Sequence, residues 1–86
     1  MKELVFKYFD TFCYGELIAD EIDPGWTKPA INNQSFGYAT KNNYLFYNGL
    51  LEDIIDSMFG VGRTKFREYF TEWFEGRYNL PVSYIV

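Results

Sequence analysis

Aromatic side chains constrain this chain more than any other feature, because nine Phe, eight Tyr and two Trp stand among its 86 residues. One buried aromatic side chain removes roughly 150–250 Å² from water. A chain this short buries only about 60–65% of its unfolded surface, so large rings are an effective way for it to build a core. The composition therefore predicts a folded protein with a single domain over residues 1–86, and it argues against intrinsic disorder.

Two residue types that support much enzyme chemistry are missing or nearly so. The chain has no histidine, and Cys13 is its only cysteine. Ser-His and Cys-His catalytic pairs, an intrachain disulfide and a Cys/His zinc site are therefore excluded. Cys13 stands between Phe12 and Tyr14, which favours a buried, unreactive thiol. We expect a non-enzymatic protein with no catalytic residues, no metal and no cofactor.

The formal net charge of −4 excludes a uniformly basic surface for nucleic acid. No apolar run approaches the roughly 18 residues that a membrane span needs. Lys7 and Asp10 interrupt the apolar start of the chain, where a signal peptide would have its hydrophobic region. These features predict a cytoplasmic protein without membrane contact.

Three segments carry apolar residues at helical spacing. Residues 4–13 favour a helix, although the alternation of Phe6 and Tyr8 with their neighbours leaves a strand as the alternative. A second helix is expected from the N-cap Asn48 to Gly60, and a third of about 12 residues from the N-cap Thr64 to Gly76. The predicted inner faces are Leu4, Val5, Tyr8, Phe9, Phe12 and Cys13 in the first helix, Leu50, Leu51, Ile54, Ile55, Met58 and Phe59 in the second, and Phe66, Tyr69, Phe70, Trp73 and Phe74 in the third.

Two other segments are predicted to form strands. Phe36 to Tyr47 is typical of a β-hairpin that turns at residues 41–43, where two asparagines tolerate left-handed backbone. Residues 80–86 are expected to form a last strand that joins the hairpin, since a hairpin alone is marginally stable. Residues 27–35 are interpreted as loop, and residues 16–23 remain undecided between helix and strand. The order of elements predicts an α+β fold, with a small antiparallel sheet (hairpin plus C-terminal strand) packed against two or three helices.

An acidic stretch without basic residues suggests a surface for a protein partner. Residues 8–27 contain no Lys or Arg, and Trp26 stands in a Pro-Gly turn just after the acidic residues. Trp is a residue that interfaces favour, and carboxylates attract a basic partner surface. The predicted partner-binding residues are Trp26 as an apolar anchor, with Asp20, Glu21 and Asp23 as a charged rim.

The segment from Ile54 to Tyr69 supports an alternative function, because it resembles a helix-turn-helix. Arg63, Lys65 and Arg67 stand within five residues, where they could contact DNA phosphates or bases from the start of a recognition helix. Asp56 counts against this hypothesis, since the residue four before the turn glycine is usually small and lies between the two helices. A third hypothesis is self-association through an open sheet edge at Val82–Val86, so monomer and homodimer both stay open.

Residues 36–86 resemble short uncharacterised proteins of tailed bacteriophages. The resemblance rests on an aromatic hairpin (Tyr44-Leu45-Phe46-Tyr47), a helix ending in Phe59-Gly60-Val61, and a Glu72-Trp73-Phe74-Glu75 helix that continues into Tyr78-Asn79-Leu80-Pro81-Val82. Small phage proteins often bind and block host machinery, including defence systems. The resemblance therefore implies a phage-encoded modulator of a host factor, and it assigns a function to no individual residue.

Overall fold

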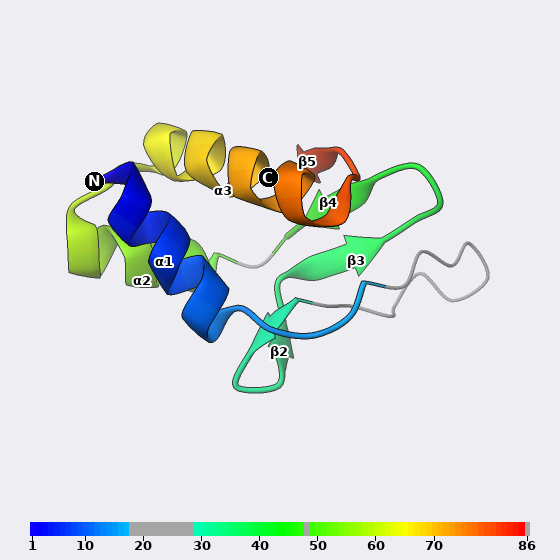
Figure 1. The fold of residues 1–86 in the computed structure, drawn as a ribbon, viewed down its shortest axis with the longest axis horizontal. Helices are drawn as coiled ribbons and strands as arrows, with labels where there is room; N and C mark the ends of the chain where they lie inside the picture. Colours follow the sequence, from blue (N-terminus) through cyan, green and yellow to red (C-terminus); the bar gives the residue numbers. More distant parts are fainter. Residues whose placement is uncertain (18–28, 48, 86) are drawn as a thin grey trace.

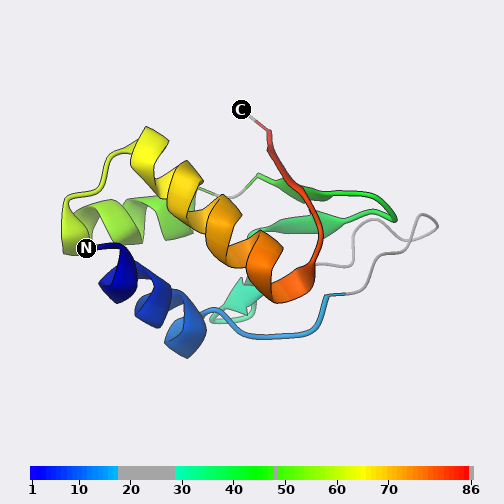
Figure 2. The same ribbon diagram turned by 45° about the horizontal axis from the view of Figure 1, so that its top comes forward.

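The computed structural model describes residues 1–17, 29–47 and 49–85. In this part of the chain, three helices and two small sheets form the α+β fold that the sequence predicts. Helices α1 and α2 lie at one end of the molecule and the larger sheet at the other, while α3 spans both parts (Figures 1 and 2). The elements are α1 (Lys2–Phe12), β1 (Ala30–Ile31), β2 (Gln34–Ser35), β3 (Gly37–Ala39), β4 (Tyr44–Phe46), α2 (Leu50–Phe59), α3 (Arg63–Tyr78) and β5 (Val82–Tyr84).

The larger sheet has the strand order β3-β4-β5. Strands β3 and β4 form the predicted antiparallel hairpin, and the C-terminal strand joins it as expected. The sheet is mixed rather than antiparallel, however, because β5 pairs with β4 in the parallel direction, with Tyr44 opposite Val82. A parallel pair needs a long crossover connection, and α2 followed by α3 supplies it.

A second hairpin occupies residues that the sequence analysis assigned to a loop. Strands β1 and β2 pair antiparallel, with Ile31 opposite Gln34. Asn32 and Asn33 form the two-residue turn with φ of 50° and 64°, the left-handed conformation at both positions that a type I′ turn requires. Tyr14 holds this hairpin, because its backbone bonds Ala30 in both directions and its hydroxyl accepts the Asn33 N–H at 3.3 Å.

The helices agree with the prediction in number but differ at several ends. Residues 2–12 are helical, which settles the choice between helix and strand. Helix α2 has Gly49 as its N-cap, whereas the expected cap, Asn48, lies outside the described residues. Helix α3 starts after Gly62 rather than at a Thr64 cap, and it continues past Gly76 to a left-handed Asn79. A glycine inside a helix costs only about 1 kcal/mol, and asparagine tolerates the left-handed end.

The core is built largely from aromatic side chains around α3, as the composition predicts. The ring of Phe70 lies at the centre, with centroid separations of 5.0–6.3 Å to neighbouring rings from α1, β4, α3 and the residue before β3. Two polar contacts also connect α1 to α3. Lys2 Nζ lies 2.7 Å from Glu72 Oε1, and the Trp73 Nε1–H donates a hydrogen bond to Asp10 Oδ1 at 2.8 Å. The buried core residues are Val5, Phe9, Cys13, Ile31, Phe36, Ala39, Tyr44, Phe46, Leu51, Ile55, Val61, Phe66, Phe70, Trp73 and Phe74.

Candidate functional site

The apolar stripes of α1 and α2 are only partly used by the core. Val5 and Phe9 of α1 are buried, as are Leu51 and Ile55 of α2. Other residues predicted on the inner faces are exposed instead. Their exposed fractions are 56% for Leu4, 51% for Phe12, 40% for Leu50 and 56% for Met58. The prediction that these four side chains are buried is therefore wrong, because α3 covers just one side of each flanking helix.

Exposed and half-buried apolar residues of the two helices form one surface, which we call the α1–α2 face. It consists of two stripes with the same spacing of four residues, Leu4, Tyr8 and Phe12 on α1 and Leu50, Ile54 and Met58 on α2. Residues four apart are neighbours on a helix surface. The two helices run in broadly opposite directions, at an oblique angle to each other (Figures 1 and 2). The Tyr8 ring joins the stripes, since its centroid lies 4.7 Å from Phe12 and 6.3 Å from Phe59 of α2.

A groove runs between the two stripes at the end nearest the β1–β2 hairpin. It encloses about 350 Å³. Its lining residues are Tyr8, Thr11, Phe12, Tyr14, Ile31, Asn32 and Ile54. Tyr14 stays 47% exposed although its hydroxyl holds the hairpin turn, so an aromatic surface is open at this end of the groove. Such a groove between helices is the usual form of a binding site for an apolar helix face.

Residues of opposite charge, Lys7 and Asp53, flank the two stripes of the α1–α2 face, and Glu3 lies one turn before Lys7 on α1. Lys7 directly precedes Tyr8 in α1, and Asp53 directly precedes Ile54 in α2, so the two side chains hold equivalent positions beside their stripes. Both residues are exposed. In the described part of the chain, neither of them forms an ion pair.

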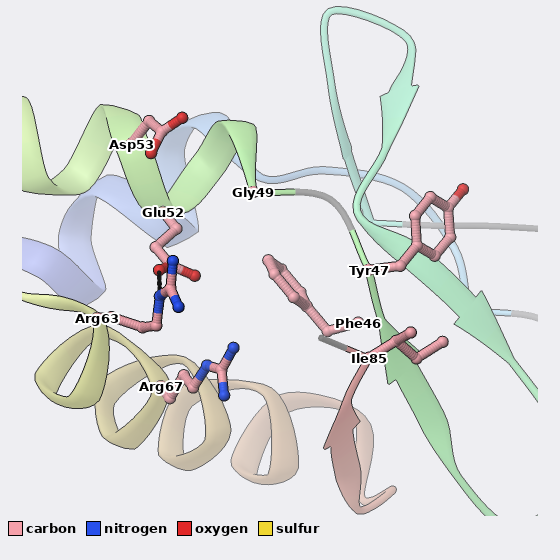
Figure 3. A pocket seen from close by; sticks show the side chains of 8 residues that line it. All are labelled: Phe46, Tyr47, Gly49, Glu52, Asp53, Arg63, Arg67 and Ile85. Carbon is pink, nitrogen blue, oxygen red and sulfur yellow. Dashed lines mark hydrogen bonds and ion pairs between the residues drawn. The ribbon is translucent and has the colours of Figure 1, made fainter.

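A second concavity, the arginine pocket, opens between α2, α3 and the strands β4 and β5 (Figure 3). Its volume is about 290 Å³. Arg63 Nε donates to Glu52 Oε1 at 2.9 Å, and the guanidinium of Arg67 packs over the Tyr84 ring at 4.9 Å from its centroid. The lining residues are Phe46, Tyr47, Gly49, Glu52, Asp53, Arg63, Arg67 and Ile85. Glu52 offsets the charge of Arg63, whereas the Asp53 carboxylate points away from both arginines (Figure 3).

The three cations of the DNA-binding hypothesis lie on one helix but engage different neighbours. Arg63 pairs with Glu52 across to α2, and Lys65 pairs with Glu68 at 3.2 Å within α3. Arg67 shares the arginine pocket with Arg63, whereas Lys65 does not line it. Asp56 is exposed, so its carboxylate is not buried between α2 and α3. DNA contact stays a prediction, and each cation already has a local partner.

The predicted partner-binding residues Trp26, Asp20, Glu21 and Asp23 lie outside the described residues. Cys13 is fully buried as predicted, and burial raises the pKa of its thiol to about 12, so the thiol stays protonated and a poor nucleophile. Within residues 1–17, 29–47 and 49–85, no group of three or more Cys, Asp or Glu is placed to hold a metal ion. In the same residues, no helix combines the length and apolar character that crossing a membrane requires.

Comparisons with known proteins give no information about the function of these surfaces. No family model, no curated protein and no solved structure matches the chain. The resemblance of residues 36–86 to small phage proteins therefore stays a prediction.

Proposed function

We propose that this chain is a non-enzymatic protein-interaction module that associates with a protein partner through the α1–α2 face. The exposure of Leu4, Phe12 and Met58, each by more than half, carries the proposal. Apolar residues scattered singly over a surface are ordinary, but a contiguous apolar patch with a polar rim marks an interaction site. The equal spacing of the two stripes suits a partner that presents a helix.

The chemistry of the described residues supports association rather than catalysis. No histidine exists in the chain, and the Cys13 thiol is buried with a raised pKa of about 12. In the arginine pocket, Glu52 is already held by Arg63. A general base must reach a substrate proton, and a nucleophile needs such a base beside it. The resemblance to small phage proteins adds a finer proposal, that the resulting complex acts on host machinery.

Photo-crosslinking in living cells tests the proposal. A benzophenone amino acid is placed at Leu4, at Met58, or at the control position Glu75, which is exposed on the outer side of α3. We expect protein adducts from the two positions on the α1–α2 face and none from the control. The proposal is refuted when neither position on the face gives an adduct, or when Glu75 gives the same adducts. Far-ultraviolet circular dichroism of each variant verifies that the fold is retained.

A further inference from the structure

Resting on the proposed function, we infer that the partner on the α1–α2 face is a second copy of this chain. The two copies pack face to face about a two-fold axis that lies in the interface, between the directions of the obliquely inclined helices α1 and α2 (Figures 1 and 2). Such an axis places α1 of each copy on α2 of the other, because it reverses left and right without reversing the helix direction. Since α1 and α2 of one copy run in broadly opposite directions (Figure 1), each helix then packs against a broadly antiparallel one.

The spacing of the two stripes fits this arrangement. A two-fold interface uses the same surface twice, so whatever α1 presents must suit α2. Leu4, Tyr8 and Phe12 repeat every four residues, and so do the three residues of the α2 stripe. Ridges formed by residues four apart interdigitate with matching ridges on a second helix at a crossing angle of about 50°, which sets the inclination of α1 on α2 of the other copy. Both helices are also similar in length, with 11 residues in α1 and 10 in α2.

The charges of Lys7 and Asp53 are complementary between copies. Lys7 and Asp53 occupy the same flank of their stripes, each one residue before the middle stripe residue. In an antiparallel helix pair, residues on the same flank of the seam face each other, and opposite charges there set the choice of partner. Lys7 of one copy therefore faces Asp53 of the other, and the two-fold axis forms this pair twice.

The exposed apolar area is of the size that a stable dimer needs. A large apolar side chain presents on the order of 200 Å² when it is fully exposed, so a half-exposed one leaves roughly 100 Å². Four such side chains on this face, with exposed fractions of 40–56%, leave about 400 Å², and the half-buried Tyr8 and Ile54 add to this area. A standard interface covers about 800 Å² per partner, of which about 65%, or roughly 520 Å², is apolar in homodimers. The face thus supplies the apolar part of one ordinary homodimer interface.

Sedimentation equilibrium over a range of protein concentrations tests the inference. We expect the 10.2 kDa chain to sediment with twice its mass at high concentration. Leu4→Glu and Met58→Glu place a carboxylate in the apolar contact and should weaken dimerisation at least a hundredfold. Both side chains are more than half exposed in one copy, so the variants should fold normally, and thermal unfolding of the monomer verifies this.

A charge exchange makes the test specific to the proposed geometry. Lys7→Glu or Asp53→Lys alone replaces two attractions by two repulsions and should weaken the dimer by about tenfold. The double variant restores the pairing and should recover the wild-type dissociation constant to within about threefold. Matched controls with the same charge changes elsewhere are Lys41→Glu and Glu75→Lys, which should leave dimerisation unchanged.

Each other outcome overturns the inference in a recognisable way. A monomer at all concentrations excludes the second copy, and a photo-crosslinked adduct with a different protein from Leu4 would then still support the proposed function. A dimer that resists both Leu4→Glu and Met58→Glu lies elsewhere, as at the open edge of β5, and overturns the inference. A dimer that the face variants abolish, but in which the double charge exchange gives no recovery, refutes the α1-on-α2 pairing.

Discussion

Replacing Gly37 by alanine tests the close contact of two backbones in the sheet. A Cβ atom at this position would lie 2.1 Å from the Leu45 carbonyl oxygen, 2.8 Å from the Leu45 carbonyl carbon and 2.9 Å from the Phe46 Cα. All three atoms belong to the backbone of β4, so no side-chain rotation relieves the clash. The strands must separate by about 1 Å, which weakens the β3–β4 hydrogen bonds and disturbs the packing beneath them. About two weakened bonds at ~1 kcal/mol each, with ~1 kcal/mol of overpacking, predict a loss of about 3 kcal/mol.

Urea denaturation followed by the fluorescence of the core tryptophan Trp73 measures this loss. Gly76→Ala is the matched control, because its added Cβ meets nothing within 4 Å and the site is inside α3. It should raise the free energy of unfolding by about 0.5–1 kcal/mol. Gly60→Ala also meets open space but has φ of +65°, so it should cost about 1 kcal/mol through strain alone. If the free energy of unfolding of Gly37→Ala lies within 0.5 kcal/mol of the wild-type value, the argument is refuted. That argument is that lack of space for a Cβ atom, rather than backbone conformation, requires glycine at this position.

Three further predictions concern groups whose environment the structure defines. The buried Cys13 thiol, with its pKa raised to about 12, should resist a disulfide reagent at pH 8 and react at once in denaturing urea; rapid labelling of the native protein would contradict its burial. Burial also raises the pKa of Tyr84 from 10.0 to about 12, so the folded state keeps a proton that the unfolded state loses. That contribution to stability is complete below pH 10 and is lost as the pH rises from 10 to 12. Urea titrations across this range, with tyrosinate absorbance at 295 nm, should show both effects together, and a stability that does not decline would exclude them. Asp10→Ala removes the acceptor 2.8 Å from the Trp73 Nε1–H and the carboxylate 3.5 Å from Arg77, and it should cost about 1–2 kcal/mol in the same urea assay. Asp10→Asn keeps an acceptor oxygen and should recover most of the loss; equal losses from both variants would assign the effect to charge alone.

The parts of the fold that the sequence predicts are those set by local periodicity. Phe66, Phe70, Trp73 and Phe74 recur at helical spacing in residues 64–75, and all four are buried in α3. Gly60 ends α2 in the left-handed conformation, as the glycine after an apolar helix indicates. These signals need only neighbouring residues, so a single sequence contains them.

Other parts depend on contacts between segments far apart in the chain. The parallel direction of β5 depends on where the end of α3 lies relative to the sheet. The residues of β5 themselves contain no signal for it. The β1–β2 hairpin did have a local signal, the Asn32-Asn33 pair, but strands of two residues are too short to show alternation. Periodicity also gives the width of an apolar stripe without saying how much of it the rest of the fold covers. That is why Leu4 and Met58 were expected inside.

The exposed stripes follow from the central position of α3. Its 16 residues place rings toward α1, α2 and the sheet at once, so α1 and α2 both pack on α3 rather than chiefly on each other. Each flanking helix therefore buries one side of its stripe, and the other side borders the groove. Closing the groove within the chain would need another apolar element on the α1–α2 face, which the described residues do not provide. The proposed second copy would provide one without additional sequence, because α1 and α2 carry stripes of equal spacing flanked by Lys7 and Asp53. The proposed partner surface accounts for the apolar residues of the two stripes that the core leaves exposed.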